Sequence, residues 1–459
     1  MKRTNFILML LVVVCFGCGT FKTETKEENK DFVANLPGNY LNPSNGANIS
    51  SNGWWHIFDS EELNNLVTIS FTNNLDLANA WTRLRLADSL ARKSNSSKYP
   101  NVNLGADSAY IDEEKGRDNN GSYGISLAAA YEIDLWGKIR ATSKSKNLET
   151  MATAENVKAT ALLLSGSIAD TWLNIKASQA RLNLLNQQVK ANTKTLDLLE
   201  SRWRVSLAAA VDVFQQEQVL AQSKSLVPQA KQEIAIYKQQ LAYLLGYTPE
   251  TKIEIVNDGL PPLPDLPSTG IPANLLENRP DVKAAWIRVQ SQDWNVVAAK
   301  ADRLPTISLT GSVGYNETDL NNLFDNWILN LAAGLVAPII DGGRRRAEVS
   351  YQEALTDQSF IEYKDTVLTA LKEVENALTK NLYQKQYLAE IEIQEKFADK
   401  TLTEAAQRYQ KGVTDYLPVL SALNSKQNLE RSIISVEENL LLNRVSLYQA
   451  LGGNVLIKN

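Results

Sequence analysis

Two long stretches of this chain contain almost none of the residues that interrupt helices. Residues 344–411 include no Gly and no Pro, and residues 138–227 include no Pro and a single Gly, Gly166. Since an α-helix rises about 1.5 Å per residue, an uninterrupted helix of roughly 68 residues would be about 100 Å long. A globular core does not need such length. The sequence therefore predicts very long helices at about 138–205 and 343–411.

Apolar side chains recur mostly at steps of three and four residues within 138–227, where Asn192 fills the one gap, and again near the C-terminus. They form two sets: Leu182, Leu185, Val189, Leu196, Leu199 and Trp203, and Ile433, Val436, Leu440, Leu447 and Leu451. This heptad-like spacing indicates neighbouring helices at shallow crossing angles. We expect two further long helices at about 210–246 and 415–452.

Four shorter runs alternate between apolar residues and small or polar ones. They lie at about 101–111, 122–134, 306–316 and 327–338. Each is about 10 residues long, the length of a tilted membrane strand. Two hairpins of a soluble sheet, packed on a core by one face, would alternate in the same way. The very long helices favour membrane strands, and since four strands cannot close a barrel, we expect an oligomer.

The second half of the chain resembles the first at a nearly constant offset. Residues 98–104 resemble residues 303–309, and Leu245-Gly246 resembles Leu451-Gly452, at offsets of 205 and 206. We therefore expect two tandem repeats, each with a helix, two strands, a very long helix, a turn and a long helix. The expected ranges are 60–246 for repeat 1, 247–276 for a proline-rich linker, 277–452 for repeat 2 and 453–459 for a tail.

The N-terminus has the features of a secretory leader. Two basic residues precede an apolar run of about 11 residues, which is too short to span a bilayer. The run ends in Gly17-Cys18, which resembles a bacterial lipobox. We expect a signal peptide at 1–17, followed at 18–59 by a lipid-anchored N-terminal segment and equatorial region. Diacylation of Cys18 would anchor this segment to a membrane. An ordinary cleavage site beside a stray thiol is the alternative.

Charge and motifs argue against several classes of function. The net charge of −5 lacks the basic excess that a nucleic-acid surface needs. His56 is the only histidine, and the chain has no phosphate-binding loop, dinucleotide fingerprint or nucleophile elbow. We predict that the chain is not an enzyme and has no catalytic residue, metal site or cofactor. After the leader, no run of 18 apolar residues predicts a transmembrane helix.

Five motifs follow one another in the order found in a known family. They are Tyr-Glu-Ile-Asp-Leu-Trp-Gly-Lys-Ile-Arg at 131–140, Asn-Arg-Pro-Asp-Val at 278–282, Pro-Ile-Ile-Asp-Gly-Gly-Arg-Arg-Arg at 338–346, Glu-Val-Glu-Asn-Ala-Leu at 373–378 and Arg-Tyr-Gln-Lys-Gly at 408–412. In these motifs the chain is similar to the TolC-type outer membrane efflux proteins, in particular their lipidated branch. The resemblance implies a mixed α/β membrane protein. Its very long helices would form a periplasmic α-barrel, and its four strands would contribute to a trimeric twelve-strand outer-membrane β-barrel.

The same resemblance implies a function and partners. The chain would be the outer-membrane channel of a tripartite efflux system, a lipid-anchored homotrimer in the outer membrane of a Gram-negative bacterium that extends into the periplasm. It would conduct small solutes from a periplasmic adaptor and an inner-membrane transporter of the RND type, with outer-membrane lipid around it. Two alternatives stay open: an exit duct for secreted polypeptides, and a non-porous coiled-coil scaffold lipoprotein.

Two of the motifs mark places where a strand passes into a very long helix. Gly137 in repeat 1, and Gly342 and Gly343 in repeat 2, permit backbone angles that are closed to other residues. Asp341 is expected to cap the following helix, and Asp134 to do so less directly. We predict a structural role for all five residues.

The turns between the long helices, near 206–212 and 412–418, are implied by the resemblance to lie at a periplasmic tip that closes the tunnel. By position, Asp212 and Tyr409 match an aspartate and a tyrosine of the network that holds relatives shut. Three copies of Asp212 around one axis would attract cations.

This chain departs from the family at the tip. The departures are Thr414 for an arginine of some relatives, Pro418 and Ser421 for the aspartates of the innermost ring, and Ser206 for a glycine. A closed state would therefore need other residues. Arg202, Arg408 and Asp415 are the candidates, with ordinary solvated charges as the alternative.

Overall fold

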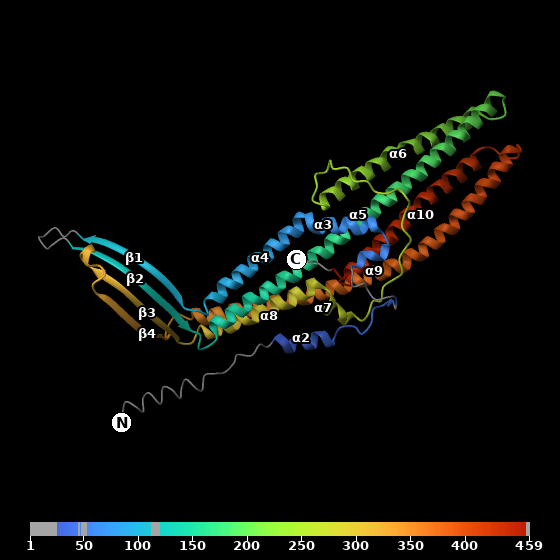
Figure 1. The fold of residues 1–459 in the computed structure, drawn as a ribbon. Coiled ribbons are helices and arrows are strands. Elements are labelled where there is room, and N and C mark those ends of the chain that lie inside the picture. Colours follow the sequence, from blue (N-terminus) through green and yellow to red (C-terminus); the bar gives the residue numbers. More distant parts are fainter. Residues whose placement is uncertain (1–24, 45, 47–52, 112–119, 456–459) are drawn as a thin grey trace. The chain divides into compact units, whose positions relative to one another are not determined.

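The computed structural model describes residues 25–44, 46, 53–111 and 120–455. The expected signal peptide and Cys18 lie outside the described residues. Most of the described chain is helical, and its strands form one four-stranded sheet (Figure 1). The mixed fold expected from the sequence, with very long helices and four strands per chain, is confirmed.

Four helices are much longer than the others. α5 (Lys138–Arg204) and α9 (Arg344–Gln410) have 67 residues each, and α6 (Ala210–Leu244) and α10 (Leu417–Ala450) have 35 and 34. α10 begins later than the expected 415 because Pro418, which lacks an N–H, is accommodated in the first turn. The shorter helical elements are α2 (Thr25–Ala34), η1 (Trp54–Phe58), α3 (Glu61–Asn73), α4 (Leu75–Ser96), η2 (Pro272–Asn274), α7 (Leu275–Asn278), α8 (Pro280–Ala301) and η3 (Leu320–Asn322).

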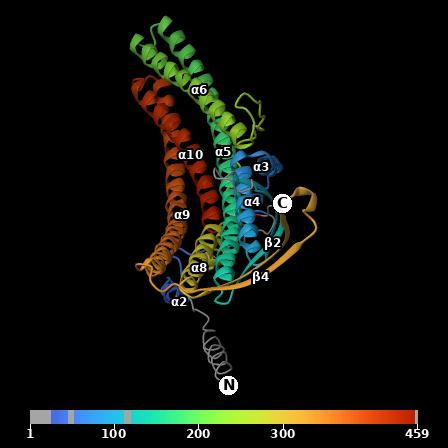
Figure 2. The same ribbon diagram turned by 90° about the vertical axis from the view of Figure 1, so that its left-hand side faces the viewer.

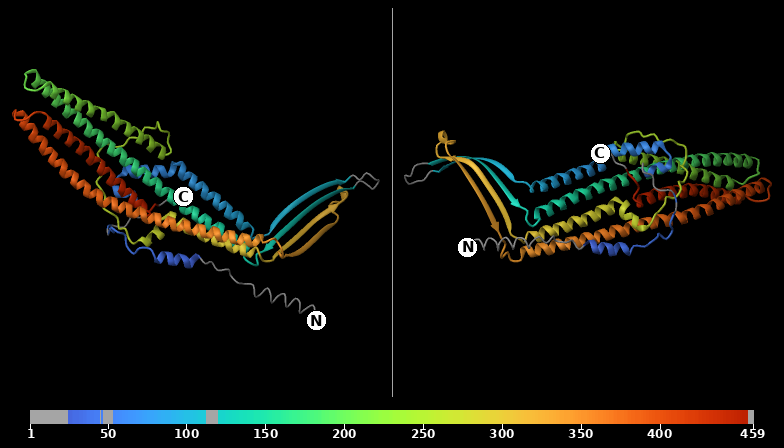
Figure 3. Two further views of the ribbon diagram at one scale, coloured as in Figure 1. Left: turned by 180° about the vertical axis from the view of Figure 1, so that it is seen from behind. Right: turned by 60° about the horizontal axis from the view of Figure 1, so that its bottom comes forward.

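The four strands form an antiparallel sheet in chain order (Figure 3). They are β1 (Asn101–Ile111), β2 (Asn120–Ile133), β3 (Thr306–Glu317) and β4 (Trp327–Val336). The pairing of β2 with β3, in which Ile125 lies opposite Tyr315, joins the two repeats within one sheet.

The strand register sorts the side chains onto two faces, because paired residues point to the same side. The apolar face includes Val102, Leu104, Ala106, Tyr123, Ile125, Leu127, Ala129, Tyr131, Leu309, Val313, Tyr315, Trp327, Leu329, Leu331 and Leu335. The small polar face includes Asn103, Asp107, Gly124, Ser126, Ala128, Ala130, Glu132, Ser308, Thr310, Ser312, Gly314, Asn330, Ala332 and Gly334, with Ile328 and Val336 near the ends of β4. The alternation read from the sequence is thus continuous across all four strands.

By their contacts the residues form two compact units, and each unit combines segments of both repeats. One unit holds the sheet, most of α8 and the first parts of α5 and α9. The other holds α3, α6, α10 and the remaining lengths of α5 and α9. Within this second unit, α9 and α10 run side by side (Figures 1 and 2).

Aromatic side chains fill part of the core of the second unit. Trp54 is fully buried, its ring stacks on Tyr448 with 6.0 Å between centroids, and its indole N–H donates to the Ser165 hydroxyl at 2.9 Å. His56 is exposed and stacks on Trp55 at 5.8 Å. None of the helices in the described part of the chain is both long enough and apolar enough to cross a membrane.

Candidate functional site

The two turns between long helices have the same hydrogen bonding. After α5, the N–H of Leu207 donates to the carbonyl of Arg202 at 2.8 Å, and after α9 the N–H of Val413 donates to that of Arg408 at 2.9 Å. Both are Schellman motifs, which need a left-handed residue just past the helix. Gly412 meets this need at φ 71°, whereas Ser206 adopts φ 59° with a side chain that disfavours it. The departure at Ser206 is therefore a strained position.

Asp212 lies in the first turn of α6 and helps to begin that helix. Its Oδ2 accepts a hydrogen bond from the backbone N–H of Ala209 at 3.3 Å. A carboxylate here also complements the positive end of the helix dipole. Asp212 is half-buried, so its charge acts on groups packed against it as well as on solvent.

An arginine and two tyrosines connect the tips of the two repeats. The guanidinium carbon of Arg202 lies 5.0 Å from the ring centroid of Tyr409, and this ring meets that of Tyr416 at 5.3 Å and 62°. The Tyr416 hydroxyl donates to Oε1 of Gln216 on α6 at 2.6 Å. The chain of contacts thus runs from α5 through α9 and the start of α10 to α6.

Burial and charge raise the pKa of both tyrosine hydroxyls above its ordinary value. Burial raises the pKa of the Tyr409 hydroxyl, and the charge of Asp212 raises it further, against the opposing charge of Arg202. Burial likewise raises the pKa of the Tyr416 hydroxyl, with added contributions from Tyr409 and Asp212. Tyr416 therefore serves as a hydrogen-bond donor to Gln216.

Apolar residues of all four long helices pack around this contact. The cluster consists of Leu199, Val213, Val219, Ala405, Tyr416, Val419 and Leu420, with Tyr409 against it. Such packing restricts the side chains that make the contact.

The structure brings together only part of the set of tip residues expected from the sequence. Arg202, Asp212 and Tyr409 lie in one cluster and are half-buried, whereas Arg408 and Asp415 are exposed to solvent. Sequence reasoning missed Tyr416 and Gln216. The heptad pattern places apolar positions at helix interfaces, but it does not single out a tyrosine and a glutamine that pair between repeats.

A chain of buried amides continues from the tip along the helices. Nδ2 of Asn192 donates to the Ser223 hydroxyl at 2.7 Å, and Nε2 of Gln427 donates to Oδ1 of Asn192 at 2.9 Å. Nε2 of Gln216 donates to the backbone carbonyl of Asn192 at 3.1 Å. Asn192 and Gln216 are fully buried. Since buried amides are costly unless they are paired, these bonds fix the alignment of α5, α6 and α10.

Aspartates cap both very long helices where the strands end. The two carboxylate oxygens of Asp134 accept from the N–H groups of Ile139 and Arg140, both at 2.9 Å. Those of Asp341 accept from Gly343 at 3.1 Å and Arg345 at 3.3 Å. Asp134 therefore caps its helix as directly as Asp341 does.

Glycines make these turns possible. Gly137 has a φ of 81°, and Gly342 and Gly343 have φ values of 64° and 84°. These angles belong to the left-handed region, which other residues adopt only with strain.

Asp302, which the sequence did not point to, joins the two turns. It lies just after α8, 2.6 Å from Nζ of Lys138 and 3.1 Å from Nε of Arg345. Although partial burial acts in the opposite direction, the hydrogen bonds and charges of Lys138 and Arg345 hold the pKa of the Asp302 carboxyl below its ordinary value. One carboxylate thus connects the beginnings of α5 and α9.

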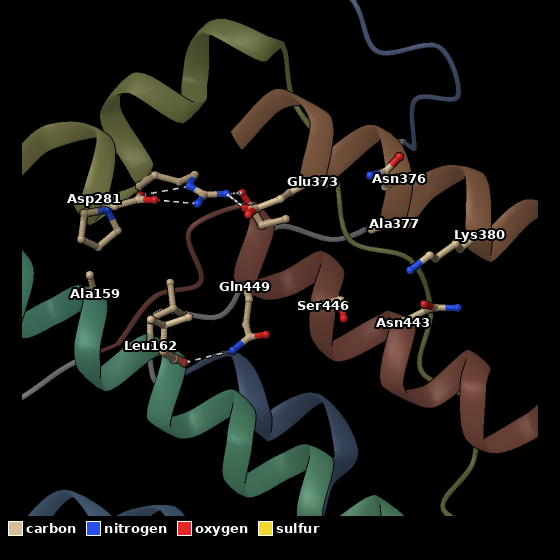
Figure 4. Close-up of a pocket in the computed structure, with 14 residues that line it drawn as sticks. Ala159, Leu162, Asp281, Glu373, Asn376, Ala377, Lys380, Asn443, Ser446 and Gln449 are labelled. Atoms are coloured by element: carbon tan, nitrogen blue, oxygen red, sulfur yellow. Dashed lines mark hydrogen bonds and ion pairs between the residues drawn. The ribbon is translucent and has the colours of Figure 1, made fainter. Parts of the chain in front are cut away.

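A cavity of about 510 Å³ lies among α5, α8, α9 and α10 (Figure 4). Arg279 forms part of its wall. The Arg279 guanidinium is 2.6 Å from Asp281 and 2.6 Å from Glu373, and it donates to the carbonyl of Ala450 at 3.1 Å. Its partners come from α8, α9 and the end of α10. These bonds hold three helices together, so we assign Arg279 a structural role. Among the described residues, no group of three His, Cys, Asp or Glu side chains is arranged to hold a metal.

Comparisons with known proteins agree with this architecture. The sequence profile described as outer membrane efflux protein matches residues 54–247 and 271–453. The chain is 28% identical over 417 residues to the pyoverdine export outer membrane protein OpmQ of Pseudomonas putida, covering 87% of each chain. It is 29% identical over 415 residues to the solvent efflux pump outer membrane protein SrpC of Pseudomonas putida, covering 86% of each.

A solved structure shows the same fold over almost the full length. The outer-membrane channel OprN superposes with a TM-score of 0.86 at 26% identity, over 95% of this chain and 98% of that one. Profile, relatives and fold agree, and the chain belongs to the outer membrane efflux protein family.

Proposed function

We propose that the chain is the outer-membrane exit conduit of a tripartite efflux system, and that three copies form one tunnel for small solutes. The proposal places it in the outer membrane of a Gram-negative bacterium, because the similar proteins OpmQ and SrpC are outer membrane proteins. The proposal rests on the sheet. Within one chain, its two edge strands each pair on one side only, and its apolar face is exposed.

The two edge strands of the sheet can pair with further strands. In the described chain β1 and β4 each pair on one side only. An open edge is a template for pairing, and a sheet removes it by closing with other copies. Because β1 and β4 are different strands, pairing of β4 of one copy with β1 of the next copy is a head-to-tail contact. Repeating this contact can close the copies into a ring. Three copies would supply twelve strands.

The apolar face of the sheet suits lipid. Leu104 and Leu331 on this face are 76% and 78% exposed, and Trp327 near its edge is 63% exposed. Apolar side chains facing outward, with an aromatic residue near one end, match a strand set that stands in a bilayer. The small polar face would then line the pathway.

The tip offers a surface for the periplasmic adaptor. Large apolar side chains in the turns and in the adjoining helix ends are exposed there, among them Trp203 at 49%, Phe214 at 65% and Val413 at 61%. Exposed apolar patches of this kind mark interaction sites. We propose that the adaptor covers this surface and that an inner-membrane transporter of the RND type supplies the energy.

The contact of Arg202 with Tyr409 is the proposed closure of the resting tip. It joins α5 to α9, and Asp212 adds a charge close to the axis on which three tips would meet. Arg408 and Asp415, which are exposed, would contribute charge at the rim.

Further assignments rest on the sequence. We propose that Cys18 is diacylated and anchors the N-terminus in outer-membrane lipid, and that the chain comprises the two tandem repeats at 60–246 and 277–452. Mass spectrometry of the mature N-terminal peptide tests the acylation, because a free thiol there would contradict it.

Release of a trapped solute from proteoliposomes tests the conduit. The wild type, closed at its tip, should release a small dye slowly, and Arg202→Ala should release it faster. A folded, helical protein that releases no dye in either form would overturn the conduit and favour the scaffold. Release of a folded peptide as fast as the dye would instead favour a polypeptide duct.

A further inference from the structure

The sheet carries negative charge and no positive charge. Its four strands contain three carboxylates, Asp107, Glu132 and Glu317, and neither Lys nor Arg. The register places Asp107 and Glu132 on the small polar face. Glu317 lies at the loop end of β3 opposite Tyr123, on the side of the apolar face.

Among the residues that the structure describes, no Lys or Arg forms an ion pair with the two carboxylates of the small polar face. Both side chains are exposed, and the ion pairs near the ends of the sheet use other residues, Lys138 with Asp302 and Arg140 with Asp134. The Asp107 carboxylate lies over Gly124 of the neighbouring strand, where an added Cβ would come within 2.7 Å of its Oδ1. A glycine at this position thus leaves room for the charged group.

The neighbours of these carboxylates are small. The residues beside them on the same face are uncharged and include Ser126, Ala128, Ser308 and Gly334. The charge of this face therefore comes from the two carboxylates. A water-filled passage with low-dielectric walls of one sign concentrates counter-ions and excludes co-ions. A face lined in this way therefore favours cations.

The two acids act at different depths. Gly124, which pairs with Asp107, and Glu132 are eight residues apart on β2, or about 27 Å at about 3.4 Å per residue. This exceeds the screening length of about 8 Å at physiological salt. The carboxylates therefore act as two separate charged zones.

We propose that Asp107 and Glu132 make the sheet-lined part of the pathway selective for cations. In a trimer each would form a ring of three carboxylates. The inference rests on the proposed conduit, and it assigns a preference of that conduit for cations over anions to two named residues of the sheet.

Reversal potentials in a planar bilayer under a tenfold KCl gradient test the proposal. The variants are Asp107→Asn, Glu132→Gln and the double variant, with Glu317→Gln as the matched control on the other face. Each is measured with and without Asp212→Asn, so that the tip charge does not mask the effect. The double variant should lower the potassium-to-chloride permeability ratio at least about threefold, and each single variant should account for part of this.

The salt dependence of the wild type gives a second readout that needs no variant. Its cation preference should grow as KCl falls from 1 M to 0.1 M, because the screening length rises from about 3 Å to about 10 Å. Channels of normal conductance whose permeability ratio is unchanged in the double variant would overturn the proposal, as would a fall of the same size in Glu317→Gln. Wild-type protein that forms no channels at all would overturn the conduit itself, which is a different result.

Discussion

Arg202 of α5 stacks on Tyr409 of α9, with its guanidinium carbon 5.0 Å from the ring centroid. By the repeat offset of 206, Arg202 corresponds to Arg408 and Tyr409 corresponds to Trp203. The repeats therefore use equivalent turns differently, because repeat 1 supplies the cation and repeat 2 supplies the ring. Arg408 and Trp203, the other members of each pair, are exposed and free to meet a partner.

We expect Arg202→Ala to loosen the tip. Cation–π contacts contribute about 0.5–2 kcal/mol, so their loss should shift the ratio of open to closed tips roughly two- to thirtyfold, seen as higher mean conductance. Tyr409→Phe keeps the ring and should resemble the wild type, whereas Tyr409→Ala should resemble Arg202→Ala. Equal conductance in Arg202→Ala and wild type would remove this contact from the gate.

Asn192 and Gln427 should be strongly coupled in stability. Asn192→Leu leaves the side-chain amide of Gln427 without its partner, whereas the Ser223 hydroxyl keeps its bond to the backbone carbonyl of Val219, and each unsatisfied group costs about 1–3 kcal/mol. Replacing both amides, as Asn192→Leu with Gln427→Leu, should recover much of the loss because an apolar pair fills the site. A double-mutant cycle from chemical unfolding measures the coupling, and additive effects would mean that the two amides do not interact.

Ser206→Gly should stabilise the protein. The left-handed backbone at φ 59° costs a residue with a side chain about 1–2 kcal/mol, and glycine avoids this. Part of the gain is offset because glycine has more freedom in the unfolded chain. We expect a net gain of up to about 1 kcal/mol in the free energy of unfolding. Gly412→Ala, at the equivalent turn, is the matched variant and should be destabilising. If Ser206→Gly and Gly412→Ala both left the free energy of unfolding unchanged, this would contradict the strain assigned to the left-handed backbone at Ser206.

The stability that Asp302 contributes should depend on pH. The pKa of its carboxyl is lowered in the folded protein, so its contribution is present above the unfolded pKa of about 4 and is lost as the pH falls through the folded pKa. Asp302→Asn should therefore cost about 1–2 kcal/mol at pH 7, and the difference from wild type should shrink below about pH 4. Unfolding midpoints across this range measure it. A difference that stays constant with pH would mean that the ion pairs with Lys138 and Arg345 contribute little.

The elements that depend on local sequence could be predicted well. The absence of Gly and Pro from 344–411 predicted a helix at about 343–411, and α9 runs over Arg344–Gln410. Period-two alternation located all four strands, because strand residues point to opposite faces in turn. Asp341 and its glycines identified a turn for the same reason, since helix capping and positive φ are properties of a few adjacent residues.

Contacts between distant segments could not be predicted in this way. Asp302 meets Lys138 and Arg345 only because the ends of α8, β2 and β4 come together, and no sequence pattern specifies this. Tyr416 meets Gln216 for a similar reason, since a heptad defines which face of a helix is buried but not its partner. Among the tip candidates, the sequence could not separate the half-buried Arg202 from the exposed Arg408.

Single-channel recording of the purified protein in a planar bilayer tests the central claim most directly, by comparing wild type with Asp212→Ala and Asp212→Asn. Asn keeps an acceptor for the Ala209 N–H, so it separates the charge of Asp212 from its role in starting α6. We expect small, stable, cation-selective currents from the wild type and altered currents from both variants, because both lose the charge at the tip. A folded, helical protein that inserts and carries no current would contradict the conduit. Wild-type currents that neither variant changes would show that the gate does not depend on Asp212.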